Sequence, residues 1–176
     1  MQCRAFNFME KSIKLKKDLR RILSIADEHG LPVMFHSDQG ECSRPLKLAK
    51  LAREFPSIRF NFAHCRPMGE MATKVMADSP NVWTDTAYMA LDEFPKLSDY
   101  DWYGRLMFGT DLPVWQAHED CSLTRRYRAY AEAFRAAGLE RSADAAFRGF
   151  VAEAKGGLRG TDGDKSPNPR SGAGGA

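Results

Sequence analysis

Three short apolar segments of this chain each end in a histidine or an aspartate and then pass into a loop. They are residues 32–35 before His36, residues 58–63 before His64, and residues 105–110 before Asp111. Short apolar runs of this kind, with helical patterns between them, favour a parallel sheet with crossover helices. Because the carboxyl ends of parallel strands lie at one edge of the sheet, the three side chains are expected to share one site.

The remaining elements follow the same alternation. Further strands are expected at residues 4–8 and 81–86, and helices at residues 14–28, from 43 onward, 70–77 and 122–137. Gly30 and Gly138 are placed to end the first and the fourth helix, since glycine adopts the left-handed conformation without strain. Ser142 is expected to cap a final helix that reaches residue 153.

Composition excludes several classes of protein. The net charge is only +3, and no basic stripe with interleaved aromatic residues predicts a nucleic-acid partner. No apolar run is long enough to cross a bilayer, and the four cysteines show no Cys-x-x-Cys pair, so we expect a cytoplasmic protein with reduced thiols. Residues 1–155 are expected to form the folded domain, and residues 156–176, rich in Gly, Ser and Pro, a disordered tail.

The ligand chemistry of the strand-end residues points to a metal. Neutral imidazole and carboxylate together are what a catalytic zinc or similar divalent ion binds. A carboxylate bound to such an ion can also accept the proton of a bound water and later return it to the leaving group. The residues alone therefore make His36, His64 and Asp111 candidate metal ligands, with Asp111 also a candidate catalytic residue.

The ordered set of strand segments also resembles a known family. The segments LPVMFHS, IRFNFAHC, NVWTDTA and RLMFGTDLPVW resemble the last four strands of the metal-dependent amidohydrolase superfamily, in its branch of small-molecule hydrolases, lactonases and decarboxylases. The resemblance covers residues 3–137 and implies a (β/α)8 TIM-barrel fold with a divalent metal ion, zinc by preference. It implies that His36 binds metal, that His64 binds a second metal or polarises the substrate, and that Asp111 binds metal and moves the proton.

The chain also departs from that family. No His-x-His pair, the principal ligand pair that the resemblance implies on a first strand, occurs anywhere in the sequence. A barrel of eight strand-helix units takes about 250 residues, so this chain supplies about five of them. We therefore expect an incomplete barrel that corresponds to the second half of the family's fold. A truncated gene product would have this form.

Two loop residues are candidates for substrate binding, and several functions remain open. Arg66 follows His64 and could hold a substrate carboxylate, and Trp115 follows Asp111 and could form a wall of the pocket. Asp85 is left between a site role and a role in ending its strand. Hydrolysis of a small ester, lactone or amide is the leading function, with decarboxylation by the same site as its variant. The alternatives are a non-catalytic fragment and a metal-dependent deoxyribonuclease of the same superfamily.

An open sheet also predicts how the chain associates. Five parallel strands leave two unpaired edges, and an inner face carrying parts of Phe35, Phe60, Phe62 and Phe108 would be exposed to water. We therefore expect self-association, or pairing with a complementary half-barrel, alongside a small-molecule substrate.

Overall fold

The computed structural model describes residues 6–8, 16–40, 43–64, 69–111 and 122–152. Its centre is a parallel sheet in which the five strands stand side by side in sequence order, as in one part of a β/α barrel. The strands are β1 (Phe6–Phe8), β2 (Val33–His36), β3 (Phe60–Ala63), β4 (Val82–Asp85) and β5 (Leu106–Met107). β1 and β5 are the two edges, so the open sheet expected from the sequence is confirmed.

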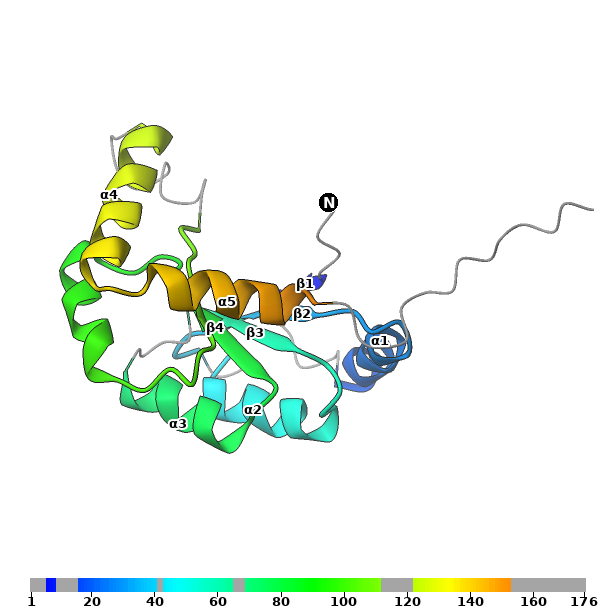
Figure 1. The fold of residues 1–176 in the computed structure, drawn as a ribbon. Coiled ribbons are helices and arrows are strands. Elements are labelled where there is room, and N and C mark those ends of the chain that lie inside the picture. The colour runs from blue at the N-terminus through cyan, green and yellow to red at the C-terminus, as the bar shows by residue number, and fades with distance from the viewer. Residues whose placement is uncertain (1–5, 9–15, 41–42, 65–68, 112–121, 153–176) are drawn as a thin grey trace, which may run out of the picture.

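Helices connect the strands, as the alternating pattern predicts. They are α1 (Lys16–Glu28), α2 (Pro45–Glu54), α3 (Glu70–Asp78), α4 (Leu123–Ala136) and α5 (Glu140–Val151), with the 3-10 helix η2 (Leu91–Asp99) between β4 and β5. The 3-10 helix was not predicted, because Pro95 interrupts a segment without a continuous apolar stripe. Figure 1 shows α2 and α3 beneath the sheet and α5 on its other side.

The helix ends agree with the sequence in two places and differ in a third. Gly30 and Gly138 both have positive φ angles, 60° and 72°, and they end α1 and α4 as predicted. The expected capping role of Ser142 is wrong. The N-cap of α5 is Leu139, and the hydroxyl of Ser142 donates instead to the Leu139 carbonyl oxygen from inside the first turn.

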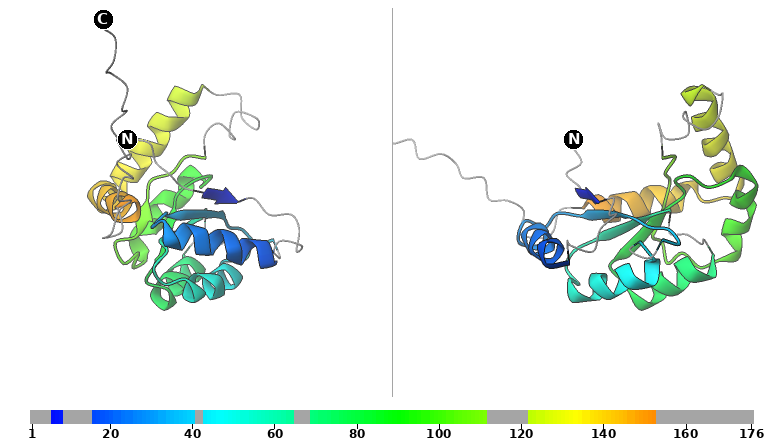
Figure 2. Two further views of the ribbon diagram at one scale, coloured as in Figure 1. Left: turned by 90° about the vertical axis from the view of Figure 1, so that its right-hand side faces the viewer. Right: turned by 180° about the vertical axis from the view of Figure 1, so that it is seen from behind.

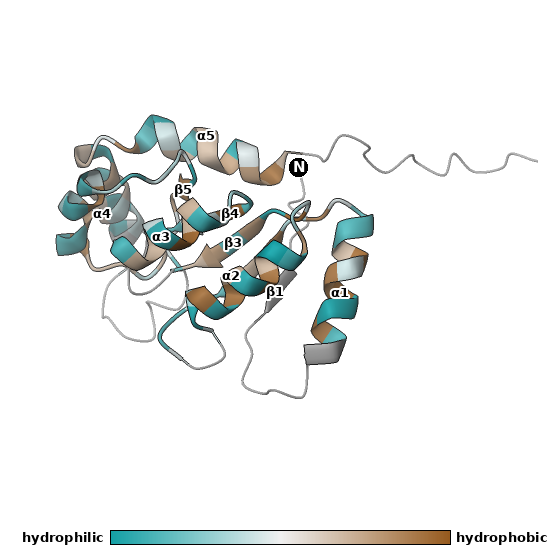
Figure 3. Ribbon diagram, turned by 90° about the horizontal axis from the view of Figure 1, so that it is seen from below, coloured by the Kyte–Doolittle hydropathy of each residue, from teal (hydrophilic) through white to brown (hydrophobic). Residues whose placement is uncertain are grey.

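One face of the sheet packs on the helices and forms the main core. Residues at alternate positions point to the same face, and Phe35, Phe60 and Phe62 form ring contacts there with centroids 5.7 to 6.4 Å apart. This face is buried against α1, α2 and α3 through Leu23, Leu48 and Val75, among others. Figure 3 shows hydrophobic and hydrophilic residues alternating along α1, α2 and α3, the pattern of helices that are buried on one side.

The opposite face of the sheet, the inner face of the barrel, carries other residues than we predicted. Of the four phenylalanines that we expected on an exposed inner face, Phe35, Phe60 and Phe62 are at most 4% exposed and lie on the helix side. The fourth, Phe108, is partly buried and packs against the main core. The opposite face carries Trp83 and Met107, which pack on Ala146 and Phe150 of α5. Figure 2 shows α5 from two further directions. The barrel-interior side of β4 and β5 is therefore covered by α5 in this chain, which removes part of the exposed apolar surface on which the self-association prediction rested.

Candidate active site

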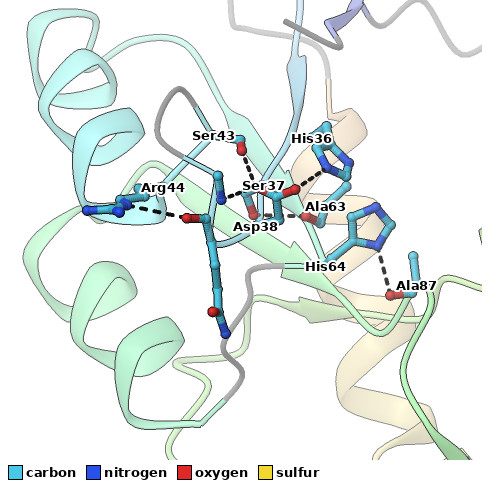
Figure 4. Close-up of polar contacts among 10 residues, drawn as sticks. His36, Ser37, Asp38, Ser43, Arg44, Ala63, His64 and Ala87 are labelled. Carbon is cyan, nitrogen blue, oxygen red and sulfur yellow. Dashed lines mark hydrogen bonds and ion pairs between the residues drawn. The ribbon is translucent and has the colours of Figure 1, made fainter. Parts of the chain in front are cut away.

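His36 is the last residue of β2 and is held by a carboxylate two residues later in the chain. Its Nε2 lies 3.1 Å from Oδ2 of Asp38. The Ser43 hydroxyl, which donates to Asp38, is the main cause that lowers the pKa of Asp38 from its ordinary value to about 2. Because an ionised carboxylate only accepts hydrogen bonds, Nε2 of His36 donates to it, and in the neutral ring Nδ1 then keeps a lone pair. Figure 4 shows this arrangement.

His64 follows β3 directly and lies beside His36. The two imidazole rings meet edge to face, with centroids 4.9 Å apart. Nδ1 of His64 lies 2.9 Å from the carbonyl oxygen of Ala87, which can only accept, so Nδ1 carries the proton and Nε2 is left with a lone pair. The backbone of His64 has a φ angle of 68°, a left-handed conformation that is uncommon outside glycine. Neighbouring strand ends thus present two imidazoles whose tautomers are both set by the protein.

A buried carboxylate fixes the backbone that carries His64. Oδ1 of Asp85, at the end of β4, accepts from the backbone N–H of His64 at 3.2 Å and from that of Ala87 at 3.0 Å. Its Oδ2 accepts from Nδ2 of Asn61 at 2.7 Å. Asp85 is 6% exposed and Asn61 is fully buried. Asp85 holds the backbone N–H groups of both His64 and Ala87, and the carbonyl oxygen of Ala87 orients the His64 ring, so Asp85 acts on the site through His64.

Asp111 lies at the end of the described segment that follows β5, and it forms no three-ligand metal group with His36 and His64 in the described structure. It is partly exposed and has a φ angle of 56°. Within the part of the chain that the structure describes, no group of three or more His, Cys, Asp and Glu residues could hold a metal ion. The donor chemistry of His36 and His64 suits a divalent ion, since each ring is oriented by a second protein group, as metal-binding histidines are. Two imidazoles are fewer ligands than the three protein ligands usual in a catalytic zinc site.

The two predicted substrate-binding residues, Arg66 and Trp115, lie outside the described residues. A pocket of about 440 Å³ adjoins the site on the side of α2. Asp38 lies on its wall together with Arg44 and Lys47. Figure 4 shows the Arg44 side chain directed away from His36, where it donates to the carbonyl oxygen of Gln39. None of the described helices is long and apolar enough to span a bilayer.

Sequence comparison now identifies the fold. The model of the amidohydrolase family matches residues 5–148. The chain belongs to the amidohydrolase family. The resemblance seen in the strand segments is therefore confirmed, and the sheet is part of the TIM barrel of a family of enzymes. No curated protein sequence matches the chain.

A solved structure supports the same fold. The chain is similar to a protein from Pseudomonas putida assigned as a 2-pyrone-4,6-dicarboxylic acid hydrolase, with a TM-score of 0.56 and 18% sequence identity. The similarity covers 84% of this chain and 62% of that protein. At this identity the likeness establishes the fold, and the chain spans less than two thirds of the length of the protein that it matches.

Sequence reasoning overlooked Asp38 and Asn61 and left Asp85 open. For Asp38 a signal was present, because it follows His36 by two residues in the strand-end loop, where a carboxylate can reach back to the ring. Asn61 was also visible, as a polar residue between Phe60 and Phe62 in a buried strand. What the sequence could not show is that Asn61 and Asp85 pair across neighbouring strands.

Proposed function

We propose that this chain contributes to a metal-dependent hydrolase that attacks the carbonyl carbon of a small ester, lactone or amide. The observation that carries the proposal is the pair of imidazoles, 4.9 Å apart at the carboxyl edge of a parallel sheet, with one ring nitrogen of each anchored. Family membership supports a hydrolase, and the arrangement of the histidines supports the position of its site. Because the four cysteines show no Cys-x-x-Cys pair and are expected to be reduced, we also propose a cytoplasmic location.

The residues have distinct proposed roles. His36 through Nδ1 and His64 through Nε2 would hold the divalent ion, zinc by ligand preference, with further ligands from outside the described residues. When bound, such an ion polarises a carbonyl oxygen and lowers the pKa of a water molecule. Asp38 keeps the His36 ring in one tautomer, and the carbonyl oxygen of Ala87, a residue whose backbone N–H is held by Asp85, does the same for His64. Asp111 would accept the proton of the attacking water and return it to the leaving oxygen as the carbon–oxygen bond breaks.

For the substrate we propose a lactone or ester that carries carboxylate groups. The solved relative is assigned to the hydrolysis of 2-pyrone-4,6-dicarboxylic acid, a cyclic ester with two carboxylates. Arg44 and Lys47, which line the adjoining pocket with Asp38, would suit such a group, and Arg66 stays a proposed carboxylate-binding residue.

The test combines zinc binding with hydrolysis. The full chain is titrated with zinc against a competing chelator, and hydrolysis of 2-pyrone-4,6-dicarboxylate is followed by loss of its ultraviolet absorbance. We expect zinc to bind more weakly than in a complete site, and His36→Ala and His64→Asn to abolish both signals. The matched control is His29→Ala, which removes an exposed histidine at the end of α1 and should change neither. Tight zinc that survives His36→Ala would contradict the proposed site.

A second candidate is a non-catalytic part-barrel that needs a complementary half. The described residues favour it in one respect, because they supply two imidazoles and no third ligand. In that case neither zinc nor hydrolysis would be detected with the chain alone. Both would appear on mixing with a polypeptide that supplies the preceding strands and a His-x-His pair.

A further inference from the structure

Strained backbone marks the same edge of the sheet as the histidines. Four non-glycine residues in the described ranges have positive φ angles, and three of them follow strand ends: His64 after β3 at 68°, Tyr88 after β4 at 58° and Asp111 after β5 at 56°. For a bulky side chain this conformation is a true outlier. Such strain concentrates at functional sites, where the rest of the structure holds it in place. Tyr88 is the member of this group with no role assigned so far.

Tyr88 stands where the backbone would favour glycine. The backbone N–H of Met89 donates to the carbonyl oxygen of Thr86 at 3.1 Å, so Tyr88 is the third residue of a tight turn. A positive φ angle at that position normally selects Gly or Asn. The turn is anchored on both sides, because Ala87 N–H donates to Asp85 and the Tyr130 hydroxyl donates to the Met89 carbonyl. The turn itself therefore does not require a tyrosine.

The ring of Tyr88 extends the row of rings at the site. It meets the His64 ring edge to face, with centroids 6.3 Å apart, and His64 in turn meets His36 in the same way at 4.9 Å. Tyr88 is partly exposed, and the main core cluster of the described residues does not include it. Three adjacent planar side chains thus form a row: His36 at the end of β2, His64 after β3, and Tyr88 in the loop after β4. Tyr88 stands at one end of this row.

We propose that Tyr88 contacts the substrate and forms an aromatic wall that selects a planar, unsaturated carbonyl compound over a saturated one. This inference rests on the proposed function. An aromatic face attracts a flat π system in offset or edge-to-face contact, whereas a puckered ring reaches it with only part of its surface. Tyr88 is therefore a specificity-determining residue beside His64, and its backbone strain is retained for the side chain.

The first test asks whether Tyr88 serves the fold. Tyr88→Gly relieves the strain, and Tyr88→Phe keeps the ring and the strain. We expect the glycine variant to unfold at an equal or higher urea concentration than the wild type, and the phenylalanine variant to unfold at the wild-type concentration. A clearly lower midpoint for Tyr88→Gly would show that the ring supports the fold, and it would overturn the inference.

The second test measures selectivity without catalysis. Benzene-1,3-dicarboxylate is planar, cyclohexane-1,3-dicarboxylate is puckered, and neither can be hydrolysed, so calorimetry with the full chain gives their dissociation constants directly. We expect the wild type and Tyr88→Phe to bind the planar compound about tenfold more tightly, and Tyr88→Gly to bind both within twofold. Equal binding by the wild type, no binding of either compound, or selectivity that survives in Tyr88→Gly would each overturn the inference. Selectivity without hydrolysis would instead refute the proposed activity and leave the role of Tyr88 intact.

Discussion

Replacing Asp85 by alanine tests whether the buried carboxylate holds the site together. The change removes the acceptor for the backbone N–H groups of His64 and Ala87 and for the amide of Asn61. Each buried donor left unpaired costs about 1–3 kcal/mol. Removing a buried charge and admitting a water molecule to the space return part of that sum. We therefore expect Asp85→Ala to lower the free energy of unfolding by about 3–4 kcal/mol.

The isosteric variant Asp85→Asn is the control. Its side-chain oxygen can still accept from both backbone N–H groups. Its new NH₂ group faces Asn61, whose Oδ1 is buried without a hydrogen-bond partner within the described structure. If the Asn61 amide rotates, that oxygen accepts from the new NH₂ group, so we expect a loss of only about 1 kcal/mol. Urea unfolding followed by tryptophan fluorescence measures both losses. Equal losses for the two variants, or a loss below about 1 kcal/mol for Asp85→Ala, would refute the reasoning.

Two further changes probe the same edge of the sheet. Ser43→Ala should raise the pKa of Asp38 from about 2 towards its ordinary value, because it removes the main hydrogen bond to that carboxylate. The pKa of Asp38 is lower in the folded chain than in the unfolded one, so the stability that Asp38 contributes is complete above about pH 4 and is lost as the pH falls through about 2. Ser43→Ala should narrow this pH range, as measured by an NMR titration of Asp38 and by a titration of stability against pH. Gly109→Ala would place its Cβ 3.1 Å from Cγ of Asp85, so we expect a loss of about 1–2 kcal/mol by urea unfolding, and an unchanged midpoint would show that Asp85 can move freely.

Much of the fold could be predicted from the chain because its local signals agree. Short apolar runs alternate with helical patterns, and the order of the five strands in the sheet follows the order in the sequence. The adjacency of His36 and His64 follows from strand register, since His36 pairs with Ala63 and His64 is the next residue. Nothing local could show that the Asp111 segment would fail to form a three-ligand group with them, because that depends on how the chain turns after each strand.

The error about the inner face has a simple physical origin. Both faces of these strands are apolar, so hydrophobicity alone does not tell them apart. The position of the site residues does tell them apart, because successive residues of a strand point to opposite faces. His36 lies on the same face as Met34, so Phe35 must point to the helices. The covering of Trp83 and Met107 by α5 was beyond sequence reasoning, because it depends on the path of the chain after α4.

The two ends of the sheet use polar side chains in different ways. At the amino end, Nδ2 of Asn81 donates to three backbone carbonyls, and the guanidinium of Arg105 donates to three more. Burial lowers the pKa of Arg105, whose hydrogen bonds join the end of α3 to the start of β4. These hydrogen bonds join helices and strands. At the carboxyl end the polar groups bond to one another and orient the two imidazoles, while the backbone there is strained at His64, Tyr88 and Asp111. Backbone strain of this kind clusters at functional sites, and in barrels of this type the carboxyl end of the strands carries the active site. The proposed site at His36 and His64 is therefore where the physical signs of function in this chain coincide.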